Sequence, residues 1–119
     1  MSNQKVGHKG EAVAALYYIK QGYELLDHNF KTRMGELDLV LKKNNQIIVA
    51  EVKTRSENYW YLPRESVNYA KRQKVILATK RYLQIKEYHD YFIRFDVVEV
   101  IARKNGGFSI HCIQDAFGL

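Results

Sequence analysis

The sequence predicts one α/β domain in which a helix, three strands, a second helix and two more strands follow one another. Apolar residues recur at helical spacing over residues 7–21 and 64–85, and shorter apolar runs separated by polar turns fill most of the remainder. With 119 residues, of which 46% are hydrophobic, the chain is long enough to bury one core. We therefore expect a single domain over residues 1–119.

Local signals mark the limits of the predicted elements. Gly22 is a stop signal after the first apolar stripe, Pro63 precedes the second helix, and Asn105-Gly106-Gly107 favours a tight turn. The elements that we expect are a helix at residues 7–21, strands at 23–31, 36–41 and 46–54, a loop at 55–63, a helix at 64–85, and a hairpin of strands at 91–103 and 108–113.

Two carboxylate residues, Asp38 and Glu51, lie in predicted strands that each have one apolar face and one face that becomes charged. Side chains of a strand alternate between its faces, so Leu37, Leu39 and Leu41 are expected on one face and Asp38 on the other. The polar connection after this strand favours a turn, which would pair the two strands as an antiparallel hairpin. Under this pairing Asp38 and Glu51 approach each other on the same face.

Lys53 follows Glu51 by two residues and is expected beside it. Two close carboxylates repel unless one is protonated or a cation lies between them. Magnesium, or manganese in its place, suits such oxygen ligands, polarises a phosphoryl oxygen and lowers the pKa of its bound water. Lys53 would orient or deprotonate that water, or offset charge on the phosphate. The alternative is a solvated strand face on which Glu51 and Lys53 form a surface ion pair of little energetic value.

Basic residues outnumber acidic ones. There are 19 Lys and Arg against 13 Asp and Glu, which gives a formal net charge of +6 and a pI near 9.4. This excess permits a polyanionic partner. The candidates for contact with nucleic acid are four basic side chains in or near the second helix: Arg55, Lys71, Arg72 and Lys74. A basic helix is equally typical of a solvated face.

Two further features add to the sequence-based expectations. The aromatic residues Tyr59, Trp60 and Tyr61 would stack on unpaired bases, or else cover the core edge or a subunit contact. Arg94 and Asp96, two apart on one strand face, predict an ion pair.

Cysteine and histidine usage exclude some classes of site. Cys112, the single cysteine, excludes an internal disulfide, and the four histidines show no zinc-like spacing. His8, near Glu11, is the one histidine that we would test as an accessory group. We expect a cytoplasmic protein without a membrane span, because the sequence has no basic leader followed by an apolar segment and no apolar stretch of about 20 residues.

Four motifs in fixed order carry a resemblance to a known family. They are Gly7-His8-Lys9-Gly10-Glu11, Gly35-Glu36-Leu37-Asp38-Leu39-Val40, Glu51-Val52-Lys53-Thr54-Arg55 and Arg94-Phe95-Asp96-Val97-Val98. With these motifs the chain resembles, almost from end to end, the YraN family of small bacterial proteins, the UPF0102 group. It departs from the family pattern at Lys31, where Arg is usual, and before the second helix, where Tyr61-Leu62-Pro63 lacks an expected glycine.

The resemblance implies a restriction-endonuclease-like core of the PD-(D/E)xK type, with a mixed central sheet flanked by helices, similar to archaeal Holliday-junction resolvases. It implies that Glu11 joins Asp38 and Glu51 as a metal ligand beside Lys53. We therefore expect a magnesium-dependent endonuclease for branched or single-stranded DNA, which contacts backbone phosphates rather than base edges.

Two alternatives remain beside this expectation. One is a non-catalytic nucleic-acid-binding module that keeps the nuclease fold, and the other is a protein-interaction adaptor whose positive charge is incidental. A homodimer is left open, because symmetric cutting of two strands calls for two sites.

Overall fold

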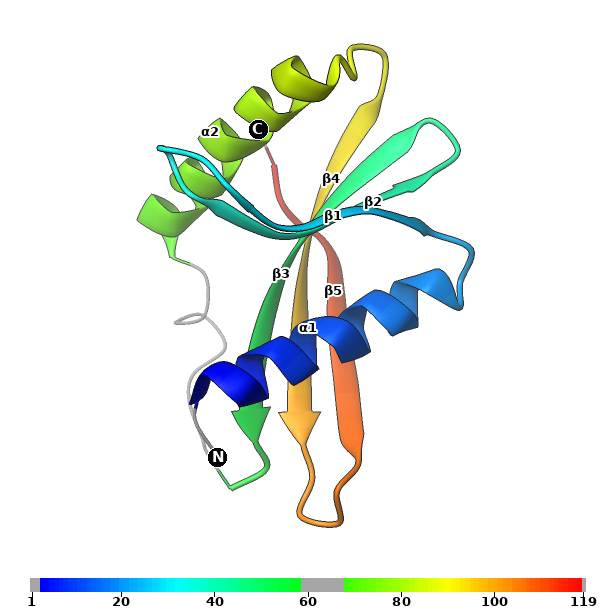
Figure 1. Ribbon diagram of the computed structural model, residues 1–119, viewed down its shortest axis with the longest axis vertical. Helices are drawn as coiled ribbons and strands as arrows, with labels where there is room; N and C mark the ends of the chain where they lie inside the picture. Colours follow the sequence, from blue (N-terminus) through cyan, green and yellow to red (C-terminus); the bar gives the residue numbers. More distant parts are fainter. Residues whose placement is uncertain (1–2, 59–67, 119) are drawn as a thin grey trace.

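The protein forms a five-stranded sheet with one helix on each face (Figure 1). The computed structural model describes residues 3–58 and 68–118, with side chains from residue 9 onward. The elements in chain order are α1 (Asn3–Ile19), β1 (Glu24–Lys31), β2 (Glu36–Lys43), β3 (Gln46–Ser56), α2 (Tyr69–Lys86), β4 (Phe92–Ala102) and β5 (Phe108–Phe117). This order confirms the predicted succession of helices and strands.

The sheet is mixed, and its strands lie in the same order as in the chain. β3 and β4 are parallel, whereas every other neighbouring pair is antiparallel. A parallel pair needs a long crossover connection. Here the connection contains α2, which lies across the face opposite α1.

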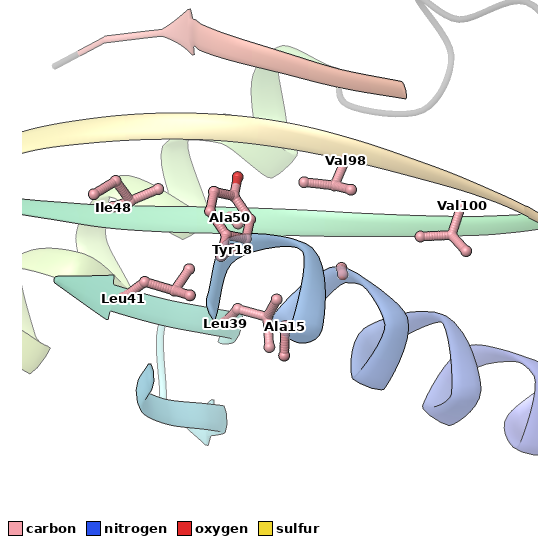
Figure 2. Packing of buried hydrophobic residues seen from close by; sticks show 9 residues of the cluster. Ala15, Tyr18, Leu39, Leu41, Ile48, Ala50, Val98 and Val100 are labelled. Carbon is pink, nitrogen blue, oxygen red and sulfur yellow. The ribbon is translucent and has the colours of Figure 1, made fainter. Parts of the chain in front are cut away.

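α1 packs against the central strands through small and aromatic residues. Figure 2 shows Ala15 and Tyr18 of α1 among buried side chains of β2, β3 and β4, including Leu39, Ala50 and Val98. On the opposite face, α2 buries Val75, Ile76, Ala78 and Tyr82 against the sheet. Because both faces are covered, the central strands carry continuous apolar runs rather than a simple alternation.

Leu37 lies on a different face from the one predicted. It packs on the α2 side of the sheet, whereas Leu39 and Leu41 pack on the α1 side. The backbone pairing of β2 with β3 ends at Leu39 opposite Ala50, and Leu37 is paired with β1 alone. Beyond the end of the β2–β3 ladder the expected alternation therefore no longer holds.

Several strands are longer than predicted. β3 continues to Ser56, so Arg55 lies in a strand and not in the expected loop. β5 continues to Phe117, four residues beyond its expected end. Both extensions are paired with β4, and this long-range pairing is what keeps them extended.

The helices also differ at their ends. α1 spans Asn3–Ile19 and not residues 7–21. α2 begins at Tyr69 instead of residue 64, because Asn68 has an extended backbone and caps the helix by accepting from the Lys71 N–H. The predicted aromatic group Tyr59, Trp60 and Tyr61 lies outside the described residues. Among the helices that the structure describes, none has the length and hydropathy that a membrane crossing requires.

Candidate active site

β2 and β3 separate at the place where Asp38 and Glu51 lie. Their backbone pairing ends at Leu39 and Ala50, and just beyond it the Val52 N–H donates a 2.9 Å hydrogen bond to Oδ2 of Asp38. A side-chain carboxylate thus replaces a backbone carbonyl as the partner of β3. This bond fixes the Asp38 carboxylate in the fork between the two strands, where Glu51 is its neighbour.

Glu51 is a buried carboxyl group at this fork. Its residue is 1% exposed, and within the described part of the chain its Oε1 atom has no hydrogen-bond partner. The pKa of Glu51 is raised to about 9, first by burial and then by hydrogen bonding to Asp38 and by the charge of Asp38. The ammonium groups of Lys71 and Lys53 oppose this rise. In the absence of a cation, the pair of carboxyl groups therefore retains a proton near neutral pH.

Lys53 and Lys71 bring two ammonium groups to the carboxyl pair. Lys53 follows Glu51 on β3, and Lys71 lies in the first turn of α2, where Oδ1 of Asn68 accepts its backbone N–H at 2.9 Å. The pKa of Lys53 is lowered to about 8, first by burial and then by Lys71, while Asp38 and Glu51 act in the opposite direction. We call Asp38, Glu51, Lys53 and Lys71 the Asp38 cluster.

Glu11 has a different partner. Nδ2 of Asn29 in β1 donates a 2.7 Å hydrogen bond to Oε2 of Glu11 and a 3.3 Å bond to Oε1 of Glu36. Within the described residues, no three side chains of His, Cys, Asp or Glu gather closely enough to hold a metal ion. The structure thus brings Asp38 and Glu51 together but does not assemble Glu11 with them.

Two of the predicted nucleic-acid contacts are engaged within the fold. Arg55 forms a salt bridge with Glu99 of β4, with 3.2 Å between Nη2 and Oε1. Arg72 lies over the ring of Phe117, with its guanidinium carbon 5.6 Å from the ring centroid. The Nε atom of Arg72 is buried and has no hydrogen-bond partner among the described residues. The Arg55 guanidinium would have to leave Glu99 to bind a phosphate fully, whereas stacking on Phe117 leaves the N–H groups of Arg72 free to donate.

Lys71 and Lys74 are placed more favourably for contact with a phosphate. Lys71 belongs to the Asp38 cluster, and Lys74 follows it by three residues, so the two lie on the same side of the helix. Lys74 is exposed, and its backbone carbonyl lies against Gly35 of the β1–β2 turn. The side chain of His8 lies outside the described residues.

Asn29 is the residue that the sequence analysis missed. It holds Glu11 and Glu36, and its φ of 51° lies in the left-handed region. A groove of about 510 Å³ between α1 and β1 has Glu11, His28 and Asn29 along its lining together with apolar residues such as Leu16. One signal was present in the sequence: Asn is uncommon inside a strand but adopts the left-handed conformation more readily than most residues.

Comparison with known proteins agrees with the four sequence motifs. The family model described as "Uncharacterised protein family UPF0102" matches residues 10–100, which include the whole Asp38 cluster. A UPF0102 protein of Clostridium tetani is 42% identical over 118 residues, covering 98% of this chain and 97% of the relative. A UPF0102 protein of Clostridium beijerinckii is 41% identical over 118 residues, covering 98% of this chain and 96% of the relative. One from Caldanaerobacter subterraneus subsp. tengcongensis is 40% identical over 100 residues, covering 84% and 82% of the two chains. The chain belongs to the UPF0102 family.

Proposed function

We propose that this protein is a metal-dependent nuclease that hydrolyses phosphodiester bonds of DNA, with its reaction centre at the Asp38 cluster. The observation that carries this proposal is the buried Glu51 carboxyl group, whose Oε1 has no partner among the described residues and which lies against a second carboxylate. A protein gains nothing in stability from such a pair, since burying an unpaired carboxyl group is unfavourable. Its placement is therefore best explained by a ligand.

The donor set suits a magnesium or manganese ion. Asp38 and Glu51 offer carboxylate oxygens, and Mg²⁺ commonly takes one or two protein carboxylates and completes its shell with water and substrate phosphate. When bound, the ion would supply Lewis-acid polarisation of the phosphoryl oxygen and a more acidic water. Glu11 stays a predicted third ligand that rests on the family resemblance alone, because its carboxylate is bound by Asn29.

The two lysines define how a phosphate would be oriented. Lys53 is on the same strand face as Glu51, and Lys71 approaches both residues from α2. An ammonium group at each position would donate hydrogen bonds to phosphoryl oxygens and offset the charge that develops on them during attack. Lys53 lies nearer in the chain to the carboxyl pair, and we assign to it the contact with the attacking water.

The proposed substrate is branched or single-stranded DNA. The exposed side chains near the cluster, such as Lys74, are suited to phosphates, and no element among the described residues resembles a recognition helix for base edges. Recognition through phosphates favours selection of DNA by its shape. The net charge of +6 is consistent with such a partner.

A cleavage assay tests this proposal directly. End-labelled single-stranded, flapped and four-way branched DNA is incubated with the purified protein in Mg²⁺, in Mn²⁺ and in EDTA. We expect cleavage with either metal and none in EDTA, and a loss of about 100-fold or more in Asp38→Asn and Lys53→Ala. Glu24→Gln, which removes an exposed carboxylate at the far end of β1, is the matched control and should cleave normally. Cleavage that survives both substitutions would place the activity outside the Asp38 cluster and would overturn the assignment.

A second candidate is a nucleic-acid-binding module without turnover. The observation that favours it is the separation of Glu11 from the carboxyl pair, which leaves two carboxylates where the family resemblance implies three. In that case the wild-type protein would bind branched DNA in a gel-shift assay, and Asp38→Asn would bind equally well or better. No metal condition would then yield cleavage.

A further inference from the structure

A second charged site lies away from the Asp38 cluster, between the β1–β2 turn and the C-terminal half of α2. This cleft has a volume of about 270 Å³ and is lined by Lys31, Thr32, Arg33, Met34, Arg81 and Ile85. Three of these side chains are basic, and none of the six is acidic. Lys31, Arg33 and Arg81 are exposed, and within residues 3–58 and 68–118 none of the three forms a salt bridge. We call this site the basic cleft.

The turn that forms one wall of the basic cleft is held by its own hydrogen bonds. The Thr32 N–H donates to the Gly35 carbonyl at 2.8 Å, and the Thr32 hydroxyl accepts the N–H groups of Met34 and Gly35 at 3.0 and 3.1 Å. A turn with these bonds presents Arg33 in a restricted position. Less conformational entropy is then lost when Arg33 binds a ligand.

The two walls are also fixed relative to each other. Phe30 precedes Lys31 on β1, Tyr82 follows Arg81 on α2, and the Phe30 and Tyr82 rings make an edge-to-face contact with centroids 4.9 Å apart. The Tyr82 hydroxyl in addition donates a 2.7 Å hydrogen bond to Asp27 of β1. The aromatic contact, together with this hydrogen bond, therefore holds β1 and α2 at a fixed spacing beside the basic cleft.

One side of α2 connects the basic cleft to the Asp38 cluster. Lys71, Lys74 and Arg81 are separated by three and seven residues, which places them along a single stripe of the helix. At 1.5 Å per residue, Arg81 lies about 15 Å along the axis from Lys71. That distance corresponds to about four base pairs of B-form DNA at 3.4 Å each.

We propose that the basic cleft binds the phosphate backbone of a double-stranded DNA arm, about four base pairs from the strand that lies at the Asp38 cluster. This inference rests on the proposed function and adds to it a requirement for duplex DNA on one side of the reaction centre. Charge complementarity selects a polyanion, and the fixed spacing of two sites favours a stiff duplex over a flexible single strand. Met34 and Ile85 would lie against the sugars between neighbouring phosphates.

Binding measurements on a cleavage-deficient protein test this proposal. In an Asp38→Asn background, fluorescence anisotropy gives the Kd for four-way DNA with arms of about 12 base pairs, a little more than one helical turn. The test variant is Arg33→Ala with Arg81→Ala. The matched control is Lys20→Ala with Lys80→Ala, which removes the same charge from exposed positions, one at the end of α1 and one next to Arg81 but outside the cleft lining. We expect the test variant to bind about tenfold more weakly and the control to change by less than about twofold.

A second DNA separates contact with the cleft from the general effect of charge. It has the same shape, but uncharged methylphosphonate linkages replace the phosphates about three to six base pairs from the branch in every arm. We expect the protein with an intact cleft to lose affinity for this DNA, and the Arg33→Ala and Arg81→Ala variant to bind both DNAs equally. Equal losses in the test and control variants, equal sensitivity to the neutral linkages, or no measurable DNA binding would each overturn the cleft proposal.

The two proposals can fail separately in these experiments. Cleavage of single-stranded DNA that depends on Asp38 and Lys53, together with an Arg33 and Arg81 variant that binds like the control, would retain the nuclease and reject the duplex contact. Phosphate-dependent binding at the cleft without cleavage of any DNA would retain the contact and reject the nuclease.

Discussion

At the scale of single residues, the ionisation of Glu51 opposes folding when no cation is present. Its pKa is raised from 4.5 to about 9 in the folded protein, first by burial and then by Asp38. The folded state therefore holds a proton that the unfolded chain releases. The stabilising contribution of this proton is complete below about pH 4.5 and is lost as the pH rises toward 9.

Glu51→Gln should remove this pH dependence, because the amide resembles the protonated carboxyl group and does not ionise. In EDTA we expect the variant to be more stable than wild type near neutral pH by on the order of 2 kcal/mol, with the difference vanishing toward pH 4.5. Urea unfolding from about pH 5 to about pH 7.5 measures this difference in stability. The range stops below the Lys53 pKa of about 8, because above that pH the lowered pKa of Lys53 makes the stability of the protein rise with pH. Glu24→Gln is the exposed control, and a Glu51→Gln protein that is less stable throughout would contradict the argument.

Residue spacing predicted pairs that lie on one strand, and it did not predict their partners from other elements. The expected Arg94–Asp96 ion pair is confirmed, with 2.9 Å between Nε and Oδ1. Spacing along the strand does not indicate that Asp96 is completely buried, or that the Tyr18 hydroxyl donates to it at 2.7 Å. In the same way, strand alternation predicted that Asp38 lies beside Glu51. The contact of Glu11 with Asn29 could not be predicted, because it depends on how α1 packs on β1.

At the scale of elements, the packing of α1 on β3 depends on a glycine in the helix. A Cβ atom at Gly10 would clash with Oγ1 of Thr54 and lie 3.0 Å from its Cβ. Ala is otherwise favoured over Gly inside a helix by about 1 kcal/mol, so this position opposes helix propensity. The close approach of the helix backbone to the Thr54 side chain accounts for the glycine, and it sets the position of Glu11, the next residue.

Gly10→Ala should therefore destabilise the protein, by about 1–3 kcal/mol, because α1 must shift to avoid Thr54. In a Thr54→Ala background the hydroxyl is absent and the same substitution should cost less. Urea unfolding of the four proteins gives the coupling energy, which we expect to exceed about 1 kcal/mol. Gly118→Ala is the control, since no heavy atom lies within 4 Å of a Cβ there. Strictly additive effects of Gly10→Ala and Thr54→Ala would show that the two residues do not constrain the helix.

The ends of the elements were harder to predict than their order, for reasons that are local in the structure. β5 continues past Ile113 because Phe117 stacks on Phe95 of β4, with centroids 4.9 Å apart. Asp115, at a φ of 53°, breaks the period-two pattern at this register shift, so alternation gave no signal for the last residues. The strand at β3 was predicted to end before Arg55, because the charged side chain ends the apolar run. The backbone of Arg55 is nevertheless paired with β4, so the strand continues.

At the scale of the whole molecule, the sheet holds the Asp38 cluster and the basic cleft on the side covered by α2. The cluster forms where β2 leaves β3, and α2 passes from this fork to the β1–β2 turn. The element order and the mixed sheet followed from sequence patterns and from the family resemblance. The basic cleft did not, because it depends on contacts between residues 31–34 and a helix about fifty residues further along the chain.

The last prediction concerns how the net charge of +6 attracts DNA. The attraction could come from the whole surface, or only from the basic groups on the side of the sheet that α2 covers. If five groups on that side, Lys31, Arg33, Lys71, Lys74 and Arg81, neutralise about four to five phosphates, the affinity of the Asp38→Asn protein for branched DNA should fall with a log–log salt slope of about −4. Between about 50 and 200 mM salt this corresponds to a loss of roughly 250-fold in affinity, measured by anisotropy.

Two pairs of substitutions distinguish binding through the α2 side from a diffuse effect of charge. If the α2 side binds DNA, replacing Arg33 and Arg81 by Ala should reduce the magnitude of the salt slope by about two, since each removes one phosphate contact. Replacing Lys20 and Lys80 should then leave the slope nearly unchanged. Equal reductions by the two pairs would mean that the protein attracts DNA through its overall charge. The observed placement of Arg33 and Arg81 on opposite walls of one cleft, with no acidic residue in its lining, favours the unequal outcome.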